Sequence, residues 1–276
     1  MTARDLHRWL RSLHPIAEPS VDQIIVGEPD KVVGRIAVAW MPTWDTLRAA
    51  HEHGCNLVVA HEPTFFAHHE SRGFDEEFPD LPPLARKSVV ETREAKRRWI
   101  EENGMVVIRC HDVLDAMPGG VVDAFGAALG FTDADCVSSV HHHRLIRVDP
   151  PVRAEVLAQR IANVLAQVGQ PGVAFHGDPA RLIRRLGLGT GYSCQPWTFL
   201  EMGADMAVTI DDRIKTWTEC EWADDSGFPM IVIHHGASEE WGVRRLCDLM
   251  ANQFPHHRVQ LLPQGFRCRW IAPHSS

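Results

Sequence analysis

Residues 54–66 have the sequence Gly54-Cys55-Asn56-Leu57-Val58-Val59-Ala60-His61-Glu62-Pro63-Thr64-Phe65-Phe66. The apolar, β-branched run 57–60 follows a helix-ending glycine and predicts a buried strand of a parallel sheet. Such a strand leads to the carboxyl edge of the sheet, where open α/β folds bind ligands. His61 and Glu62 come next, and Pro63 ends the ladder because it has no N–H to donate. The pair is interpreted either as half of a metal site or as an ordinary strand-end turn.

The size and composition are those of a soluble globular protein. The 276 residues, 45% apolar and 23% charged, are enough for one large domain or for two smaller ones. No apolar run approaches the roughly 18 residues that a membrane helix needs, and residues 1–6 do not resemble a signal peptide. The seven cysteines form no CxxC pair, which favours reduced thiols. We therefore expect a cytoplasmic protein.

The charge balance bears on the partners. The formal net charge is −8 with the 17 histidines counted as neutral, and no long basic run is present. Neither nucleic acid nor an anionic membrane is therefore an expected partner.

Along the chain, apolar strand patterns alternate with helical patterns, which predicts an α/β fold. The polar segment 67–83 is interpreted as a loop, and the second half of the chain begins after a polar stretch around residues 132–143. Strands are expected at residues 24–26, 35–40, 57–60, 105–110, 145–148, 185–188, 206–210, 230–233 and 258–262.

The chain contains an internal repeat. Gly27-Glu28-Pro29 and the strand from Arg35 match Gly177-Asp178-Pro179 and the strand from Arg185, at an offset of 150 residues (177 − 27). The Gly54 turn matches the Gly203 turn at an offset of 149 (203 − 54). A near-constant offset favours a duplicated α/β unit over a chance likeness of two βαβ segments. We expect two related halves, 1–130 and 131–276; the alternative for the final helix and strand is that they return to the first half.

Other strands also end in histidine. Cys110 is followed by His111, and Ile233 by His234 and His235. Two similar halves that face each other would gather His61, Glu62, the turn 111–115 and the segment 234–239 into one cleft. Imidazole and carboxylate ligands suit zinc, iron, manganese or nickel, and they argue against a structural zinc site built on thiolates.

Five side chains are too many for one tetrahedral ion with an open position. They suit two ions about 3.5–4 Å apart, an arrangement that supports metal-assisted hydrolysis. His235 and Glu239 are four residues apart, so they share one face if a helix has begun by residue 235.

Several motifs carry a family resemblance: Gly27–Lys31, Gly54–Pro63, His111–Val121, Gly177–Pro179, Gly203–Asp205 and His235–Glu239. In this order and spacing, the chain resembles the Nif-three-like (NGG-one-interacting factor) dinuclear metal centre family, also labelled GTP cyclohydrolase I type 2 homologues. The resemblance implies two α/β halves, a ring-shaped hexamer and two metal ions between the halves. It implies a ligand set of His61, Glu62, Asp115, His235 and Glu239.

The sequence departs from the family pattern at three places. Glu62 replaces the second histidine of a pair, Asp22 is all that remains of an aspartate-rich strand start, and Asp112 is an additional carboxylate. The hypothesis for Glu62 is that it binds or bridges a metal and favours harder ions; the alternative is a salt-bridged carboxylate. His111 and Asp112 are candidate catalytic acid/base groups, and a structural histidine is the alternative for His111.

Two functions follow from the resemblance. The first is a metal-dependent hydrolase of a small polar or nucleotide-like substrate, although no residue is identified that would recognise the guanine of GTP. The second is a non-catalytic metal-handling or regulatory scaffold. Three further segments are assigned no metal: 141–143 is expected to be an exposed turn, 68–69 a solvated loop, and 187–191 either an anion-binding loop or a site of tight glycine packing.

Overall fold

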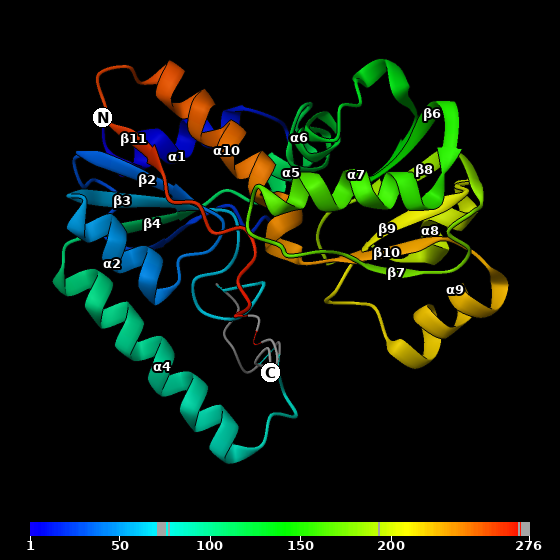
Figure 1. The fold of residues 1–276 in the computed structure, drawn as a ribbon. Helices are drawn as coiled ribbons and strands as arrows, with labels where there is room; N and C mark the ends of the chain where they lie inside the picture. Colours follow the sequence, from blue (N-terminus) through cyan, green and yellow to red (C-terminus); the bar gives the residue numbers. More distant parts are fainter. Residues whose placement is uncertain (71–75, 77, 193, 270, 272–276) are drawn as a thin grey trace, which may run out of the picture. The chain divides into compact units, whose positions relative to one another are not determined.

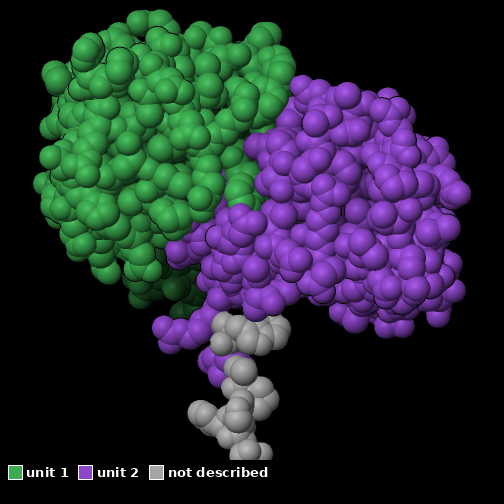
Figure 2. Space-filling model, turned by 45° about the horizontal axis from the view of Figure 1, so that its top comes forward, with its two compact units in different colours: residues 1–121, 241–263 green, residues 122–240, 264–276 purple. Residues whose placement is uncertain are grey.

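The computed structural model describes residues 1–70, 76, 78–192, 194–269 and 271 of the chain (Figure 1). The chain divides into two compact units, which Figure 2 colours separately. Unit 1 comprises Met1–Val121 and Trp241–Pro263, and unit 2 comprises Val122–Glu240 and Gln264–Ser276. The chain passes from unit 2 to unit 1 within one helix, α10 (His235–Gln253).

Unit 1 is built on a five-stranded sheet with the order β1-β4-β3-β2-β11. Strands β4, β3, β2 and β11 are parallel, and β1 is antiparallel to β4 at one edge. The strands are β1 (Ile24–Val26), β2 (Arg35–Ala39), β3 (Cys55–Ala60), β4 (Val106–Arg109) and β11 (Val259–Leu261). The helices of this unit are α1 (Ala3–Ser12), α2 (Trp44–Glu52), α4 (Pro83–Glu102) and α5 (Asp112–Ala116), together with most of α10.

The sheet of unit 1 is covered on both faces, as its continuous apolar strands require. Alternate residues of β3 enter two different clusters: Leu57 and Val59 pack with α1 and α10, whereas Val58 and Ala60 pack with α2 and α4. Figure 1 shows these helix pairs on opposite sides of the sheet. Burial of one such leucine or valine stabilises the fold by about 1.5–3 kcal/mol. Thr43 caps α2 as predicted, because its Oγ1 accepts the Thr46 N–H.

Unit 2 has a six-stranded sheet with the order β5-β6-β8-β9-β10-β7. Strands β8, β9 and β10 are parallel, and β5, β6 and β7 pair antiparallel with their neighbours. The strands are β5 (Cys136–Val140), β6 (His143–Arg153), β7 (Ala174–His176), β8 (Leu182–Gly189), β9 (Met206–Ile210) and β10 (Met230–Ile233). The helices are α6 (Val121–Ala128), η1 (Asp133–Asp135), α7 (Ala154–Ala166), α8 (Pro196–Glu201), η2 (Thr216–Cys220) and α9 (Glu221–Ser226).

The two sheets share a four-strand arrangement that supports the internal repeat. The order β1-β4-β3-β2 of unit 1 matches β7-β10-β9-β8 of unit 2, and in each the outer strand is antiparallel. Gly27 and Gly177 both have positive φ, and a Cβ at either would collide with a backbone carbonyl. The fifth strand differs, since β11 is parallel to β2 whereas β6 is antiparallel to β8.

Some elements were not predicted. The polar stretch 132–143, where no strand was predicted, contains η1 and β5, and β6 is longer than the expected strand at 145–148. β5 is largely exposed, so its sequence lacks the buried alternation that marks a strand. Among the described residues, no helix is both long enough and apolar enough to cross a bilayer.

Candidate metal-binding site

The polar residues of unit 1 gather where its parallel strands end. Ala60 pairs with Ala39 of β2 and with Arg109 of β4, so the three strands finish at the same edge. His61 and Glu62 follow directly, and their N–H groups donate to Trp40 O at 3.0 and 2.7 Å. The strand end is thus closed by backbone hydrogen bonds, and the two side chains are held in fixed directions.

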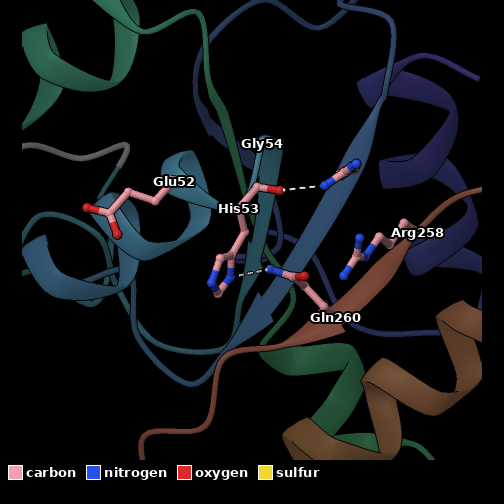
Figure 3. Close-up of a pocket in the computed structure, with 6 residues that line it drawn as sticks. Glu52, His53, Gly54, Arg258 and Gln260 are labelled. Carbon is pink, nitrogen blue, oxygen red and sulfur yellow. Dashed lines mark hydrogen bonds between the residues drawn. The ribbon is translucent and has the colours of Figure 1, made fainter.

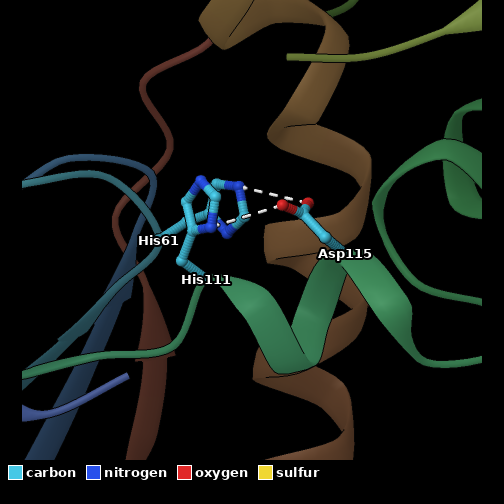
Figure 4. Close-up of side chains that lie close together, drawn as sticks. All are labelled: His61, His111 and Asp115. Carbon is cyan, nitrogen blue, oxygen red and sulfur yellow. Dashed lines mark ion pairs between the residues drawn. The ribbon is translucent and has the colours of Figure 1, made fainter. Parts of the chain in front are cut away.

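His61, His111 and Asp115 form a compact group at this edge (Figure 4). His61 Nε2 lies 3.6 Å from Asp115 Oδ1, and His111 Nδ1 lies 3.3 Å from Asp115 Oδ2. The two imidazoles are stacked, with centroids 4.6 Å apart and planes at 10°. Two imidazoles and one carboxylate are a donor set that binds zinc or iron.

The orientation of His61 fits a metal ligand. Its Nδ1 lies 3.2 Å from Cys110 O, a backbone carbonyl that can only accept, so Nδ1 carries the proton. Nε2, on the other side of the ring, then presents its lone pair toward Asp115. A ligand histidine in proteins characteristically donates its second N–H in this way. The ring is 1% exposed, so the arrangement is fixed by packing.

Asp22 positions the turn that carries His111. It is 3% exposed, and its carboxylate accepts the N–H groups of His111, Asp112 and Val113, the last at 2.8 Å. These are the first amide groups of the short helix α5, which have no partner within the helix itself. The hydrogen bonds fix where α5 begins and thereby place Asp115 one turn further along.

Asp112 acts on His111 from the neighbouring position. Its Oδ1 lies 3.0 Å from His111 Nδ1, and its Oδ2 accepts Ser20 Oγ at 2.8 Å and Val21 N–H at 3.2 Å. Burial opposes ionisation, but these hydrogen bonds outweigh it and hold the pKa of Asp112 well below its usual value. Asp112 is therefore placed to orient the His111 ring.

Glu62 pairs with a residue that the sequence did not single out. Arg109 is 1% exposed, and its Nη2 lies 3.5 Å from Glu62 Oε2. The same guanidinium donates from Nε to His61 O at 3.1 Å and from Nη1 to His68 O. Glu62 Oε1 lies 4.0 Å from His111 Nε2. The sequence did contain a signal for this pair, namely an arginine within an apolar strand pattern. A charge buried in such a strand requires a partner.

The loop that follows Glu62 is held by two buried ionisable groups. Lys96 of α4 donates to Thr64 O at 2.7 Å, and Glu70 accepts Phe65 N–H at 2.6 Å. Burial lowers the pKa of Lys96 to about 8 and raises the pKa of Glu70 to about 7. Burial, with the charges of His111 and Arg109, lowers the pKa of His68 to about 4.

A second group lies in unit 2, at the carboxyl ends of β9 and β10. α10 begins at His235, so His235 and Glu239 share a face, with Nε2 3.1 Å from Oε2. On the other side of the ring, His235 Nδ1 lies 2.7 Å from Asp212 Oδ2. Glu239 is 1% exposed. Asp212 was not predicted, although its place directly after a buried strand was visible in the sequence.

The remaining sequence candidates fall elsewhere. The prediction of an exposed turn at 141–143 is wrong for His143, which is 5% exposed and packs on Phe199 with centroids 5.0 Å apart. In the segment 187–191, Gly187 and Gly189 belong to β8. A Cβ at Gly187 would lie 2.5 Å from the Phe199 ring, and one at Gly189 would collide with Cys194. Tight packing thus accounts for these two glycines without an anion.

A cavity of about 510 Å³ lies at the opposite edge of the unit 1 sheet (Figure 3). Its lining includes Arg35, the first residue of β2. It also includes His53, which precedes β3, and Arg258, which precedes β11. Arg35 Nη1 donates to His53 O at 3.0 Å, and Gln260 Nε2 lies 2.8 Å from His53 Nδ1. These contacts fix the C-terminal end of α2, which is a structural task.

Comparison with known proteins agrees with this architecture. The structure is similar to that of the Staphylococcus aureus hypothetical protein SA1388, with a TM-score of 0.76 and 19% identity over 98% of this chain and 99% of that one. It is also similar to the structure of a Bacillus cereus protein related to NIF3, with a TM-score of 0.73 and 12% sequence identity over 99% of both chains. The structure of reduced HcgD from Methanocaldococcus jannaschii gives a TM-score of 0.68 and 14% sequence identity, over 95% of this chain and 98% of that one. At these identities the likeness shows the fold alone.

The search of curated proteins found no significant match. The model of the Duf34/NIF3 (NGG1p interacting factor 3) family matches residues 1–80 and 81–263, which is most of the chain. The chain therefore belongs to the Duf34/NIF3 (NGG1p interacting factor 3) family.

Proposed function

We propose that this protein binds two divalent metal ions and acts as a metal-dependent hydrolase on a small polar substrate. The proposed ligands are His61, Glu62 and Asp115 of unit 1 and His235 and Glu239 of unit 2. The observation that carries the proposal is the orientation of His61, whose Nδ1 is turned to Cys110 O while Nε2 lies 3.6 Å from Asp115 Oδ1. A ring nitrogen that donates to a backbone carbonyl, with the other nitrogen directed at a carboxylate, is the arrangement characteristic of a ligand histidine.

The donor set indicates the kind of ion. Imidazoles and carboxylates without thiolates suit zinc, iron, manganese or nickel. When bound, such ions supply Lewis acidity, which favours hydrolysis at a polarised substrate oxygen. His111 lies within 3.3 Å of Asp115 and 3.0 Å of Asp112, so we include it either as a further ligand or as the group that moves a proton. Asp112 has the role of orienting it.

A non-catalytic, metal-handling role is the second candidate. Burial favours it: His61 is 1% exposed, Glu62 7% and Asp115 8%, which leaves little of these side chains open to a substrate. We also propose, from the family resemblance, that the protein assembles as a ring-shaped hexamer. Size-exclusion chromatography with light scattering tests the assembly independently of any activity.

Elemental analysis of tag-free protein, purified without chelator or added metal, tests the metal proposal. The expected result is about two equivalents per chain, with metal lost in His61→Ala and in His235→Ala. His176→Ala is the matched control, because His176 Nδ1 forms a similar 2.9 Å pair with Asp224 in unit 2 but belongs to neither ligand group. Metal content that is unchanged in both ligand variants would overturn the proposal. A substrate screen with the metal-loaded protein then separates the hydrolase from the handling role.

A further inference from the structure

A cavity of about 490 Å³ opens within unit 2, at the carboxyl ends of β9 and β10. This volume lies in the range of small-molecule sites, and this edge of a parallel sheet is where α/β folds bind ligands. Its walls are mainly apolar and come from Val173, Ala174, Val232, Ile233 and Phe266. The residues that line the cavity do not include a proposed metal ligand, but two of them, Asp211 and His234, directly precede Asp212 and His235.

One wall is fixed by a buried glutamine. Gln170 is 4% exposed, its Oε1 accepts His234 N–H at 3.2 Å, and its Nε2 donates to Gly172 O at 2.7 Å. A single side chain thus ties the segment before β7 to the residue that follows β10. The wall is formed before any ligand arrives, which reduces the entropic cost of binding.

The opposite wall is the ring of Phe266, and it is held just as specifically. Glu240 is fully buried, and its Oε2 accepts the N–H groups of Gln264 and Gly265 at 3.2 and 3.1 Å. Phe266 N–H donates to Val168 O at 3.0 Å. Gly265 has φ +50°, and a Cβ there would collide with Val168 O, so the approach requires glycine. The Phe266 ring meets His234 edge-on, with centroids 5.1 Å apart.

The polar groups indicate what kind of ligand would bind. Asp211 Oδ1 accepts His235 N–H at 3.1 Å, which holds the carboxylate at the cavity. The residues that line the cavity include neither lysine nor arginine, although Arg267, next to Phe266 in sequence, is close enough to act on the charge of His234. The Asp211 carboxylate itself only accepts, which favours a ligand that donates N–H hydrogen bonds. Apolar walls with an aromatic ring favour a flat ligand.

We infer that this cavity binds a small planar heteroaromatic ring that donates N–H groups to Asp211 and packs against Phe266. Its role as the recognition site for the ring of a substrate rests on the proposed function. Binding of the ring itself does not depend on metal. The neighbouring positions of Asp212 and His235 would place the rest of such a substrate near the ligand group of unit 2.

Ligand-observed NMR titration of chelator-treated protein tests the inference with three probes of similar size. Adenine carries an amino group, purine lacks it, and benzoate is planar and anionic. We expect saturable adenine binding with a Kd of about 1 mM or below, the range open to a ligand of this size. Purine should bind several-fold more weakly and benzoate at least about tenfold more weakly. Benzoate as the tightest probe, or no saturable adenine binding, would overturn the inference.

Variants assign the binding to this cavity. Ala174→Phe and Val232→Phe each fill the cavity from a different wall and should abolish adenine binding. Ala174 is exposed on an edge strand, so its variant should fold and keeps the test valid if Val232→Phe does not fold. Asp211→Asn should remove the preference for adenine over benzoate. Val156→Phe, at a position of α7 that is 50% exposed, is the control and should bind normally. Adenine binding that persists in both filling variants would refute the assignment. Because metal content is measured separately, failure here leaves the metal proposal standing, and the reverse also holds.

Discussion

The guanidinium of Arg109 lies 3.5 Å from the carboxylate of Glu62, and both side chains are buried within unit 1. Arg109 also donates to the backbone of His61 and of His68, so a single cation connects a proposed metal ligand with the loop that follows it. A buried charge is tolerated only when it is paired and hydrogen-bonded. Glu62 therefore has a structural partner in addition to its proposed role as a ligand.

Removal of one member of this pair should cost more than removal of both. We expect Arg109→Met to lower the free energy of unfolding by about 3–5 kcal/mol, because it leaves Glu62 buried without its cation. Adding Glu62→Gln should restore part of this loss, with a coupling energy above about 1 kcal/mol. Denaturant unfolding of the wild type, the two single variants and the double variant measures this coupling energy, and chelator in the buffer removes any contribution from bound metal.

The exposed pair Arg4 and Asp30, whose side chains are 52% and 75% exposed, is the matched control for that cycle. Its coupling should be small beside that of the buried pair, because solvent screens exposed ion pairs. Equal couplings for the two pairs, or additive effects at Arg109 and Glu62, would show that the buried contact has no special weight.

Asp22 should affect metal binding although it is not a proposed ligand. Asp22→Ala removes the acceptor for three backbone N–H groups at the start of α5, which we expect to cost about 1–3 kcal/mol of stability. Because α5 carries Asp115, metal affinity measured by competition with a chelator should fall as well. Asp22→Asn keeps one acceptor oxygen and should recover part of both losses. Normal affinity in the alanine variant would contradict the positioning role.

The strands and the repeat were predictable because both depend on local sequence. Leu57–Ala60 is apolar throughout, as a strand covered on both faces must be, and Gly27 and Gly177 occupy turns that exclude a Cβ. The strand-end residues His61 and His111 could be placed at one sheet edge because parallel strands bring their carboxyl ends together.

What could not be predicted depends on contacts between residues far apart in sequence. No local pattern pairs Arg109 with Glu62 or Asp212 with His235, since each contact exists only once the sheet has formed. His143 was predicted to be exposed from its polar neighbours, but the register of β6 turns it onto Phe199. The exposed strand β5 shows the same limit, because pairing with β6 and not burial defines it.

The glycines at the end of β8 give a prediction that separates packing from anion binding. Gly187→Ala should lower stability by about 1–3 kcal/mol, because the new methyl group would meet the Phe199 ring. Gly187→Ala combined with Phe199→Leu should be less destabilised than the sum of the two single variants. Gly172→Ala is the control, since no atom lies within 4 Å of a Cβ there and the variant should be near neutral. Stability that responds to added phosphate, and no effect of Gly187→Ala, would favour an anion site.

Glu70 should make the protein less stable as the pH rises toward neutrality. Burial raises its pKa from 4.5 to about 7, so between these values the folded protein binds more protons than the unfolded chain. The stabilising contribution is complete below pH 4.5 and is lost as the pH rises through 7, a change of about 3 kcal/mol. The lowered pKa of Lys96, about 8, makes stability rise with pH, but only above that pH. The range pH 5–7.5 therefore reports on Glu70 without a contribution from Lys96.

Glu70→Gln isolates this contribution, because glutamine resembles the protonated acid at every pH. The excess of the variant over the wild type in unfolding free energy should grow steadily from pH 5 to pH 7.5, measured by urea titration in the presence of chelator. Glu91→Gln, at a position of α4 where the side chain is 66% exposed, should follow the wild-type curve throughout. If the Glu70→Gln curve instead runs parallel to that of the wild type, Glu70 is ionised in the folded protein across the whole range and the loop is held by a charged pair with Lys96.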